Sequence, residues 1–340
     1  MKKRYVRAAV VSTLSCSICF LVLVILLKTT LRIQSALASN DILVMLGLSD
    51  VEWSTRFSNI EEWSPPHWLD HEEYSEIWSI EGIEQDPVFA KGPRIRARAA
   101  FVYDLDRGEV LYDKQADEIW PVASLTKTIS ALTLATEGFT HSELEKQYCL
   151  DNESKPGLPG AKTRFSYKNC YSGWDLFGSA LVSSDNGAAL SFPNISGLPT
   201  DVFVDKMNLL AQDLHMTRST FVDSAGLSDD NLSTARDMTK AIVAAAFHPT
   251  VSISSSAPSW FSKPKSNRGA YRRNTTNKLM TWKNAETLAA KTGFTFTADG
   301  CYSTVMEVDG RRIAMTILGS PSLKQRWRDA KKLLDWTIKH

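Results

Sequence analysis

Segments typical of β-strands stand at both ends of the body of this chain, and segments typical of helices fill its middle. The body begins near Arg98, and residues 99–114 form two apolar runs around Asp-Arg-Gly, which is a hairpin signal. Asp309-Gly310 is a second strong hairpin turn, near the C-terminus. The late strand-like runs are residues 287–296, 301–310 and 311–320. This order predicts an α+β fold in which both ends share one antiparallel sheet, flanked by helices and with a helical subdomain beside it.

The helices expected between these ends have distinct signals. Residues 201–216 place Phe203, Met207 and Leu210 on one helical face. Residues 233–247 open with Thr234 and Asp237 at the spacing of a capping box. A last helix is expected over residues 322–340, where the side chains available to pack on the sheet are Trp327, Ala330, Leu334 and Ile338.

The N-terminal segment is basic and then strongly apolar. Residues 1–38 carry six basic and no acidic side chains, and they contain twenty uncharged residues, 8–27. About twenty apolar residues span a bilayer as a helix. Four positive charges before this run and two after it predict that the N-terminus stays in the cytoplasm and that the body lies outside the cytoplasmic membrane. Residues 35–39 resemble a cleavage site but lie well past the run and behind two charges, Lys28 and Arg32, so an uncleaved anchor is favoured over a signal segment.

A second segment, residues 39–96, differs from both neighbours. Residues 39–90 hold twelve acidic side chains and one basic, Arg56, together with four tryptophans. Two interpretations stay open, an extension that packs on the body and an arm that binds a partner. The predicted organisation is therefore an anchor or signal segment at 1–38, an acidic Trp-rich membrane-proximal segment at 39–96, and the body at 97–340.

The cysteines follow from this topology. Outside the cytoplasm disulfides persist, and Cys149 and Cys170 are close enough in sequence to be candidates for one. Cys301 would then be left over. No cysteine or histidine spacing suggests zinc, and neither a metal nor a cofactor is expected.

A serine and a lysine stand at the start of the apolar run 120–138. Ser124 occupies the expected N-cap and Gly138 the expected end of a helix. Side chains three apart share a helical face, so Lys127 can reach the Ser124 hydroxyl. A lysine acts as a base for serine only if burial or a second cation lowers its pKa. The alternative is a helix cap followed by a surface lysine.

Two further short motifs follow in order. Ser184-Asp185-Asn186 is expected in a loop between short helices, and Lys291-Thr292-Gly293 on a strand, where Lys291 supplies the second cation. The three motifs are the Ser-x-x-Lys, Ser-x-Asn and Lys-Thr-Gly set of penicillin-recognising serine enzymes. With the blocks at 99–132, 181–190 and 207–238, the chain resembles the low-molecular-mass penicillin-binding proteins, the D-alanyl-D-alanine carboxypeptidase and endopeptidase family, over about residues 97–340.

This resemblance implies a beta-lactamase/transpeptidase-like fold and a role for each motif residue. Ser124 would be the nucleophile, Lys127 its general base and Ser184 the relay of a proton to the leaving amine. Asn186 would hold the acyl side chain. Lys291 and Thr292 would bind the substrate carboxylate, with Lys291 charged and Lys127 neutral near pH 7. The backbone N–H groups of Ser124 and of Phe294, which follows Gly293, would form the oxyanion hole.

The implied activity is that of a serine-type D-alanyl-D-alanine carboxypeptidase acting on peptidoglycan stem peptides, with beta-lactam antibiotics as covalent inhibitors and no nucleic-acid partner. Only 47 residues follow Gly293, too few for the further β-rich domain of the larger family carboxypeptidases, and this length favours a D,D-endopeptidase that cleaves cross-links. A penicillin sensor without turnover stays open. A β-lactamase is disfavoured because no Glu-x-x-Leu-Asn stretch lies between the second and third motifs.

Overall fold

The computed structural model describes residues 83–89, 91–136, 141–150, 155, 163–167, 169–266 and 270–340. The expected anchor at 8–27, most of the acidic segment and Gly138 lie outside the described residues. Within the described ranges, no helix combines the length and apolar character needed to cross a bilayer.

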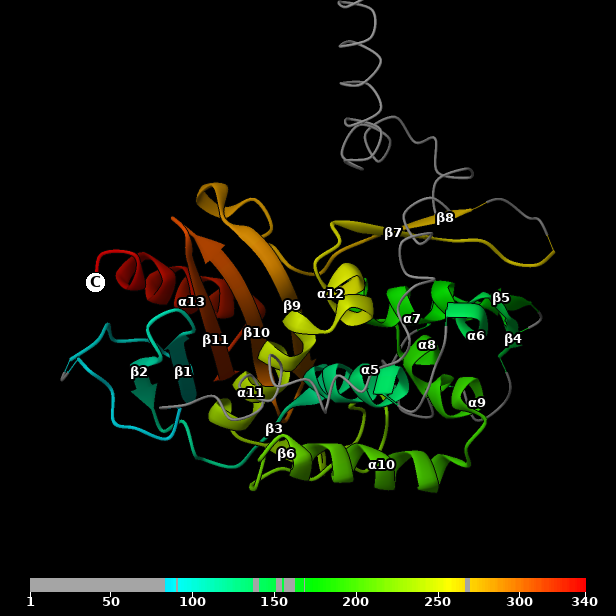
Figure 1. Cartoon of the computed structure of the whole chain (residues 1–340), viewed down its shortest axis with the longest axis horizontal. Coiled ribbons are helices and arrows are strands. Elements are labelled where there is room, and N and C mark those ends of the chain that lie inside the picture. The colour runs from blue at the N-terminus through cyan, green and yellow to red at the C-terminus, as the bar shows by residue number, and fades with distance from the viewer. Residues whose placement is uncertain are drawn as a thin grey trace, which may run out of the picture. The chain divides into compact units, whose positions relative to one another are not determined.

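A five-stranded antiparallel sheet joins the two ends of the body, as the sequence predicts (Figure 1). Its spatial order is β2-β1-β11-β10-β9. Asp309 and Gly310, with φ of 52° and 74°, form the turn between the last two strands, and positive φ at both central residues is what a type I′ hairpin turn requires. The strand bounds are β1 Ala99–Asp104, β2 Glu109–Lys114, β9 Glu286–Thr295, β10 Asp299–Val308 and β11 Arg311–Ser320.

Both faces of this sheet are buried, because helices cover each of them. Phe101 and Tyr103 of β1 point into the core shared with α11 (Ala235–Phe247). Ala100 and Val102 point the opposite way, towards α13 (Leu323–Thr337), as the period of two along a strand requires. On α13 the predicted contact residues Trp327, Ala330 and Leu334 are buried, and Ile338 is partly buried.

A cluster of helices lies beside the sheet (Figure 1). Its α10 (Thr200–Asp213) buries Phe203, Met207 and Leu210, so the predicted apolar face is confirmed. The other helical elements are η1 Ala123–Leu125, α5 Thr126–Thr136, α6 His141–Glu145, α7 Gly173–Val182, α8 Asn186–Leu190, α9 Phe192–Ser196, α12 Pro249–Ser255 and η2 Trp282–Asn284. The short strands pair as β3 (Trp120–Pro121) with β6 (Leu232–Ser233), β4 (Gln147–Cys149) with β5 (Cys170–Ser172), and β7 (Ser259–Ser262) with β8 (Tyr271–Asn274).

The capping box expected at the start of α11 is only half formed. The Thr234 side chain caps the helix by accepting the Asp237 N–H at 3.0 Å. The Asp237 carboxylate does not accept the Thr234 N–H, as a capping box requires. Its Oδ2 accepts the Arg218 N–H and the Ser219 hydroxyl instead, each at 2.9 Å. Asp237 therefore ties a preceding loop to the helix instead of closing the cap.

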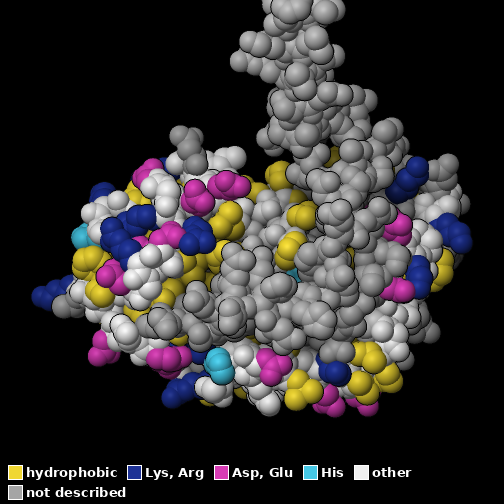
Figure 2. Space-filling model, in the orientation of Figure 1, with side chains coloured by type: hydrophobic (Ala, Val, Ile, Leu, Met, Phe, Trp, Pro, Cys, Tyr) yellow, Lys and Arg dark blue, Asp and Glu magenta, His cyan; other side chains and the backbone are white. Residues whose placement is uncertain are grey.

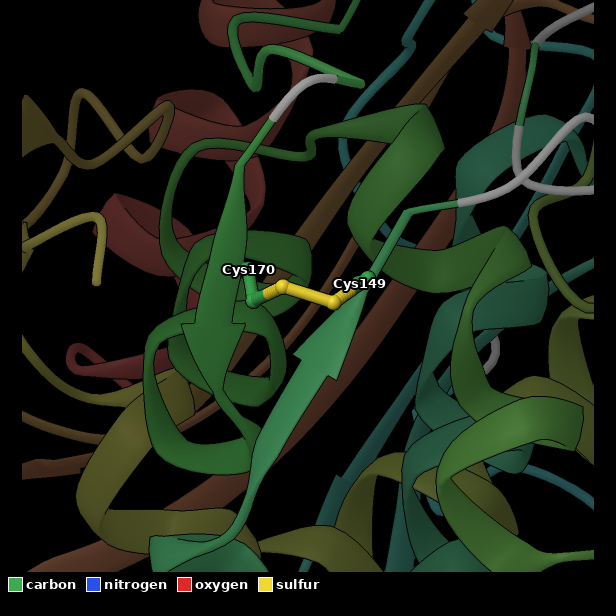
Figure 3. The surroundings of a disulfide bond; sticks show 2 residues. All are labelled: Cys149 and Cys170. Atoms are coloured by element: carbon green, nitrogen blue, oxygen red, sulfur yellow. A yellow bond between two sulfur atoms is a disulfide. The ribbon is translucent and has the colours of Figure 1, made fainter. Parts of the chain in front are cut away.

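The disulfide between Cys149 and Cys170 is present, which confirms that candidate pairing (Figure 3). The two cysteines are direct partners in the β4–β5 ladder. Cys301 on β10 is a free, buried thiol, as expected once Cys149 and Cys170 pair with each other. The disulfide and the ladder together hold the two ends of the segment between residues 149 and 170.

The described end of the acidic segment 39–96 packs on the body. Ile83 is buried, and its carbonyl accepts a hydrogen bond from Arg236 of α11. Glu84 forms an ion pair with Lys240 at 2.8 Å. The Val88 N–H donates to Val110 of β2 at 2.9 Å. For these residues the packing interpretation is confirmed, while the domain boundary at residue 97 stays a prediction.

Candidate active site

Ser124 lies in a tight turn that leads into α5. It is the middle residue of η1, and not an N-cap, so that part of the expectation is wrong. The turn begins with Ala123 at φ 48°, a left-handed conformation that L-residues seldom adopt. Gly226, at φ 71°, lies against this turn, and a Cβ there would come within 1.9 Å of the Ala123 carbonyl oxygen. The absence of a side chain at Gly226 therefore leaves room for the turn that presents Ser124.

Lys127 reaches back from the first turn of α5 to Ser124. Its Nζ is 2.8 Å from Ser124 Oγ and 2.8 Å from Asn186 Oδ1. It also donates to the carbonyl of Ala225. The side chain is fully buried, so these three oxygens replace water around the amine. The structure thus rules out the alternative of a surface lysine.

Burial changes the chemistry of this amine. Removal from water lowers the pKa of Lys127 from 10.5 to about 7, although the negative charges of Asp223 and Asp185 act in the opposite direction. A large fraction of Lys127 is then neutral near pH 7. A neutral amine 2.8 Å from a hydroxyl is placed to accept its proton.

The Ser184-Asp185-Asn186 motif connects α7 to α8. Ser184 adopts φ 57°, and Asn186 is the first residue of α8. Asp185 caps that helix by accepting the Ala188 N–H at 3.1 Å, and it also accepts the Thr163 hydroxyl at 2.7 Å. The buried carboxylate of Asp185 therefore fixes the backbone from which Ser184 and Asn186 project.

Lys291 of β9 is the second buried amine of the site. Its Nζ donates to Ser184 Oγ at 2.7 Å and to the Thr292 carbonyl at 2.9 Å. Burial first, and then the charges of Lys127 and Arg326, lower its pKa well below the ordinary value. Both effects disfavour the charged form of Lys291, and the expectation that Lys291 is charged near pH 7 stays a prediction. A carboxylate beside Lys291 would favour its charged form.

The rest of the Lys-Thr-Gly motif packs against the turn that carries Ser124. The Thr292 hydroxyl donates to Thr276 Oγ1 at 2.7 Å. A Cβ on Gly293 would lie 2.8 Å from the Val122 carbonyl oxygen, so a side chain there would push β9 away from η1. Phe294, the next residue, is 43% exposed. The motif thus brings its polar groups and the Phe294 backbone alongside Ser124.

Sequence reasoning missed Asp223, which supports the Lys127 site from a loop. Its carboxylate accepts the N–H groups of Ala225 at 2.7 Å and Gly226 at 2.6 Å. It also accepts those of Leu227 at 3.0 Å and Ser228 at 2.8 Å. These bonds hold the loop whose Ala225 carbonyl binds Lys127. The signal was an aspartate followed by Ser-Ala-Gly, which is typical of a tight side-chain-to-backbone turn.

Arg326 of α13 was missed as well. Its guanidinium donates from Nη1 to the carbonyls of Gly293 at 2.8 Å and Cys301 at 3.1 Å. Arg326 is buried, and burial lowers its pKa to about 10. A basic residue four positions before Ala330, on the apolar face of a helix, was the available signal. Arg326 therefore ties the end of the Lys-Thr-Gly motif to the neighbouring strand.

All eight residues expected at the site lie in this region, on η1, α5, the α7–α8 connection and β9. The hydrogen bonds form two pairs, Ser124 with Lys127 and Ser184 with Lys291. Each pair joins a hydroxyl to a buried amine, which is the arrangement that activates a serine and moves protons during acyl transfer.

Comparison with known proteins agrees with this chemistry. The profile of the peptidase S11 family, described as D-alanyl-D-alanine carboxypeptidase, matches residues 86–322. The chain is 29% identical over 250 residues to the D-alanyl-D-alanine endopeptidase of Escherichia coli, covering 73% of this chain and 79% of that one. It is 30% identical over 241 residues to the D-alanyl-D-alanine endopeptidase of Pseudomonas aeruginosa, covering 70% and 76%.

Solved structures show the same architecture. Penicillin-binding protein D2 of Listeria monocytogenes, in a cefotaxime-bound form, superposes with a TM-score of 0.63 at 28% identity, covering 73% of this chain and 99% of that one. The DD-transpeptidase of Streptomyces K15 superposes with a TM-score of 0.67 at 21% identity, covering 73% and 100%. The beta-lactamase/transpeptidase-like fold expected from the sequence is confirmed.

Proposed function

Because the chain belongs to the peptidase S11 family of D-alanyl-D-alanine carboxypeptidases, a family of serine peptidases, we propose that Ser124 is the nucleophile that removes the terminal D-alanine of peptidoglycan stem peptides. The observation that supports this most is the fully buried Lys127, whose Nζ lies 2.8 Å from the Ser124 hydroxyl. The pKa of about 7 makes this lysine a base at neutral pH.

Acylation uses the Ser124–Lys127 pair. Ser124 Oγ attacks the carbonyl carbon of the penultimate residue as its proton passes to Lys127 Nζ. The oxygen of the tetrahedral intermediate lies between the backbone N–H groups of Ser124 and Phe294, which stabilise its negative charge. Asn186 binds the acyl part of the substrate and, through the 2.8 Å bond to Lys127, orients the base.

Leaving-group departure uses the second pair. The C–N bond breaks as Ser184 gives its proton to the amine of the departing D-alanine. The proton that Lys127 took from Ser124 then restores the Ser184 hydroxyl, so Lys127 is neutral again, while Lys291 holds Ser184 in place through the 2.7 Å bond. A water molecule then attacks the acyl-enzyme and gives a proton to Lys127. Lys127 passes this proton to Ser124 Oγ as the bond between Oγ and the acyl carbon breaks, which restores the free enzyme.

The substrate carboxylate binds at the Lys-Thr-Gly motif. Lys291 supplies the positive charge and Thr292 a hydroxyl, and Gly293 lets β9 lie close to the turn that carries Ser124. Beta-lactams carry a carboxylate beside a reactive amide, so they acylate Ser124 and act as covalent inhibitors. The cefotaxime-bound form of the Listeria structure supports this part of the proposal.

A second candidate function is D,D-endopeptidase activity on peptidoglycan cross-links. The two relatives compared above both carry the name D-alanyl-D-alanine endopeptidase. Cross-link cleavage uses the same acylation chemistry, with a longer leaving group. Release rates from a pentapeptide and from a cross-linked muropeptide, measured side by side, distinguish the two activities.

The place of action is a further part of the proposal. The uncharged run at 8–27 and the surrounding Lys/Arg bias support an anchor in the cytoplasmic membrane, with the body on the outer side. The Cys149–Cys170 disulfide also supports an oxidising location outside the cytoplasm.

The nucleophile is tested by covalent labelling. We expect labelled penicillin to acylate Ser124, and Ser124→Ala to abolish both labelling and release of D-alanine. Ser252→Ala removes a hydroxyl that donates to the Pro249 carbonyl on α12; it is the matched control and should label like the parent. A label found by mass spectrometry on another residue contradicts the assignment.

The same assay distinguishes the alternative functions. Labelling without release of D-alanine indicates a sensor, and rapid release of ring-opened penicillin indicates a β-lactamase.

A further inference from the structure

Two phenylalanines form an exposed aromatic pair at the end of β9, just beyond the Lys-Thr-Gly motif. Phe294 is 43% exposed, and Phe296, the first residue after the strand, is 96% exposed. Their ring centroids are 5.9 Å apart in an edge-to-face arrangement. An almost fully exposed phenylalanine gains little from burial in the fold, and its ring is accessible to a ligand in the neighbouring site.

The turn that carries Phe296 is anchored and not loosely attached. Asp229 accepts a hydrogen bond from the Thr297 hydroxyl at 2.6 Å and one from the Thr295 hydroxyl at 3.2 Å. Thr295 Oγ1 also accepts the Ala298 N–H at 2.9 Å. Bonds on both sides of Phe296 therefore hold its backbone in place while its ring stays in solvent. Because the backbone is already fixed, less entropy is lost when a ligand covers the ring.

The direction of β9 says which part of a ligand the pair would meet. In the proposed function Lys291 and Thr292 bind the carboxylate of the leaving residue, and the Phe294 N–H binds the oxygen of the reacting carbonyl. Continuing along the strand leads away from the leaving group, so Phe296 lies on the acyl side of the scissile bond. A group joined one amide bond from the reacting carbonyl is the part of the ligand that would reach this pair.

We propose that Phe296, together with the Phe294 ring, forms a specificity wall for an apolar or aromatic group on the acyl side of the substrate or of a beta-lactam. This inference rests on the proposed acylation of Ser124. The wall contacts the acyl segment and leaves the carboxylate end to Lys291. The enzyme should therefore be acylated faster by peptides or antibiotics that carry a bulky apolar group at this position.

The test compares two penicillins that differ by one ring. Benzylpenicillin carries a phenylacetamido group, and 6-acetamidopenicillanic acid carries a methyl group in place of the benzyl group. The second-order rate constant for acylation of Ser124 is measured for both with the full chain. In the parent protein we expect benzylpenicillin to react faster. Phe296→Ala should reduce the ratio of the two rate constants by about three- to tenfold, the range expected for loss of one aromatic contact.

Two further variants make the outcome specific. Phe296→Trp keeps an aromatic surface and should keep the ratio within about twofold of the parent, on the same aromatic contact. Leu209→Ala shortens an exposed aliphatic side chain on α10 and should leave the ratio unchanged. A ratio that is the same in Phe296→Ala and in the parent overturns the proposal. So does an equal loss of rate for both penicillins, because Phe296 would then only support the turn.

The result separates this inference from the function on which it rests. If neither penicillin acylates Ser124 in the parent protein, the proposed function fails and the wall has no ligand. If both penicillins acylate Ser124 but the ratio of their rate constants is unchanged in Phe296→Ala, the proposed function stands and only the specificity wall is wrong.

Discussion

A buried lysine beside a serine decides the chemistry at the scale of single residues. Lys127 is surrounded by oxygens of Ser124, Asn186 and Ala225, yet desolvation dominates and lowers its pKa to about 7. A protonated lysine cannot accept the serine proton, whereas a neutral one can. In the proposed mechanism, acylation therefore depends on the fraction of Lys127 that has lost its proton.

This dependence gives a pH profile with a defined sign. Below a pH of about 7 Lys127 is protonated, so the acylation rate constant should fall roughly tenfold per pH unit as the base is removed. Above that pH the rate should level off. Stopped-flow labelling with penicillin between about pH 5 and 9 brackets this pKa. An acylation rate that is flat across that range contradicts Lys127 as the base.

Substitution of the two lysines separates their roles. Lys127→Ala should slow acylation by about 10²- to 10⁴-fold, the range for loss of a general base, and no pH should restore the rate. Lys291→Ala, the comparison variant, should mainly weaken the binding of penicillin and substrate, because it removes the partner of the carboxylate. If Lys127→Ala acylates as fast as the parent, the Ser124 proton leaves by another path.

At the scale of elements, the β7–β8 hairpin supports the Ser-Asp-Asn motif from outside the helices. Arg273 of β8 is 2% exposed and lies 3.6 Å from the carboxylate of Asp185. Its guanidinium also stacks over Phe165 at 4.0 Å and donates to Ser262 Oγ at 3.0 Å. The hairpin thus supplies a buried positive charge to the carboxylate that positions Ser184 and Asn186.

Loss of this charge should weaken both the fold and the site. Arg273→Met leaves the Asp185 carboxylate buried without a cation, so we expect the free energy of unfolding to fall by about 3 kcal/mol. The acylation rate should fall as well, since Ser184 and Asn186 lose their fixed backbone. Arg272→Met changes the exposed neighbour on the same strand and is the matched control. Equal stability of the two variants by chemical denaturation would falsify this role of Arg273.

The elements that follow local patterns could be predicted from the sequence, and the contacts between distant segments could not. The two hairpins, α10 and α13 follow periodicity and turn residues that a single stretch of chain contains. Ser124 in a 3₁₀ turn, and Asp237 turned away from its cap, depend on neighbours that approach only in the fold. The same holds for Arg326, whose partner Gly293 is 33 residues away.

The candidate site divides in the same way. Its motif residues have recognisable spacing, so Ser124, Lys127, Ser184 and Lys291 could be named in advance. The pKa of Lys291 could not be predicted, because burial and the charge of Arg326 add to the effect of Lys127. Sequence reveals which groups react, whereas the protonation of each group depends on how much water the fold removes.

At the scale of the whole molecule, the described surface carries charge of both signs. Figure 2 shows Lys/Arg and Asp/Glu side chains interspersed over the described part of one face. The described part of this face therefore offers no single-sign patch to a polyanion. The charge asymmetry that matters lies along the chain, between the basic residues 1–38 and the acidic residues 39–90.

That asymmetry predicts the topology of the full chain. A reporter enzyme that is active only after export, fused after His340, should be active in intact cells, because the Lys/Arg bias retains the N-terminus in the cytoplasm. The same fusion without residues 1–38 is the control and should be inactive. Activity of a cytoplasm-only reporter at His340, with no signal from the export reporter, contradicts the outward orientation of the body.

The position of β9 at the end of the sheet order has a consequence for solubility. Within the described residues β9 pairs on one side only, with β10. An unpaired strand edge is a template for another strand, including the same edge of a second molecule. Self-association there would cover the strand that carries Lys291, Thr292 and Gly293. A dimer formed at this edge would exclude a peptide from the proposed carboxylate site, so aggregation through β9 would also inactivate the protein.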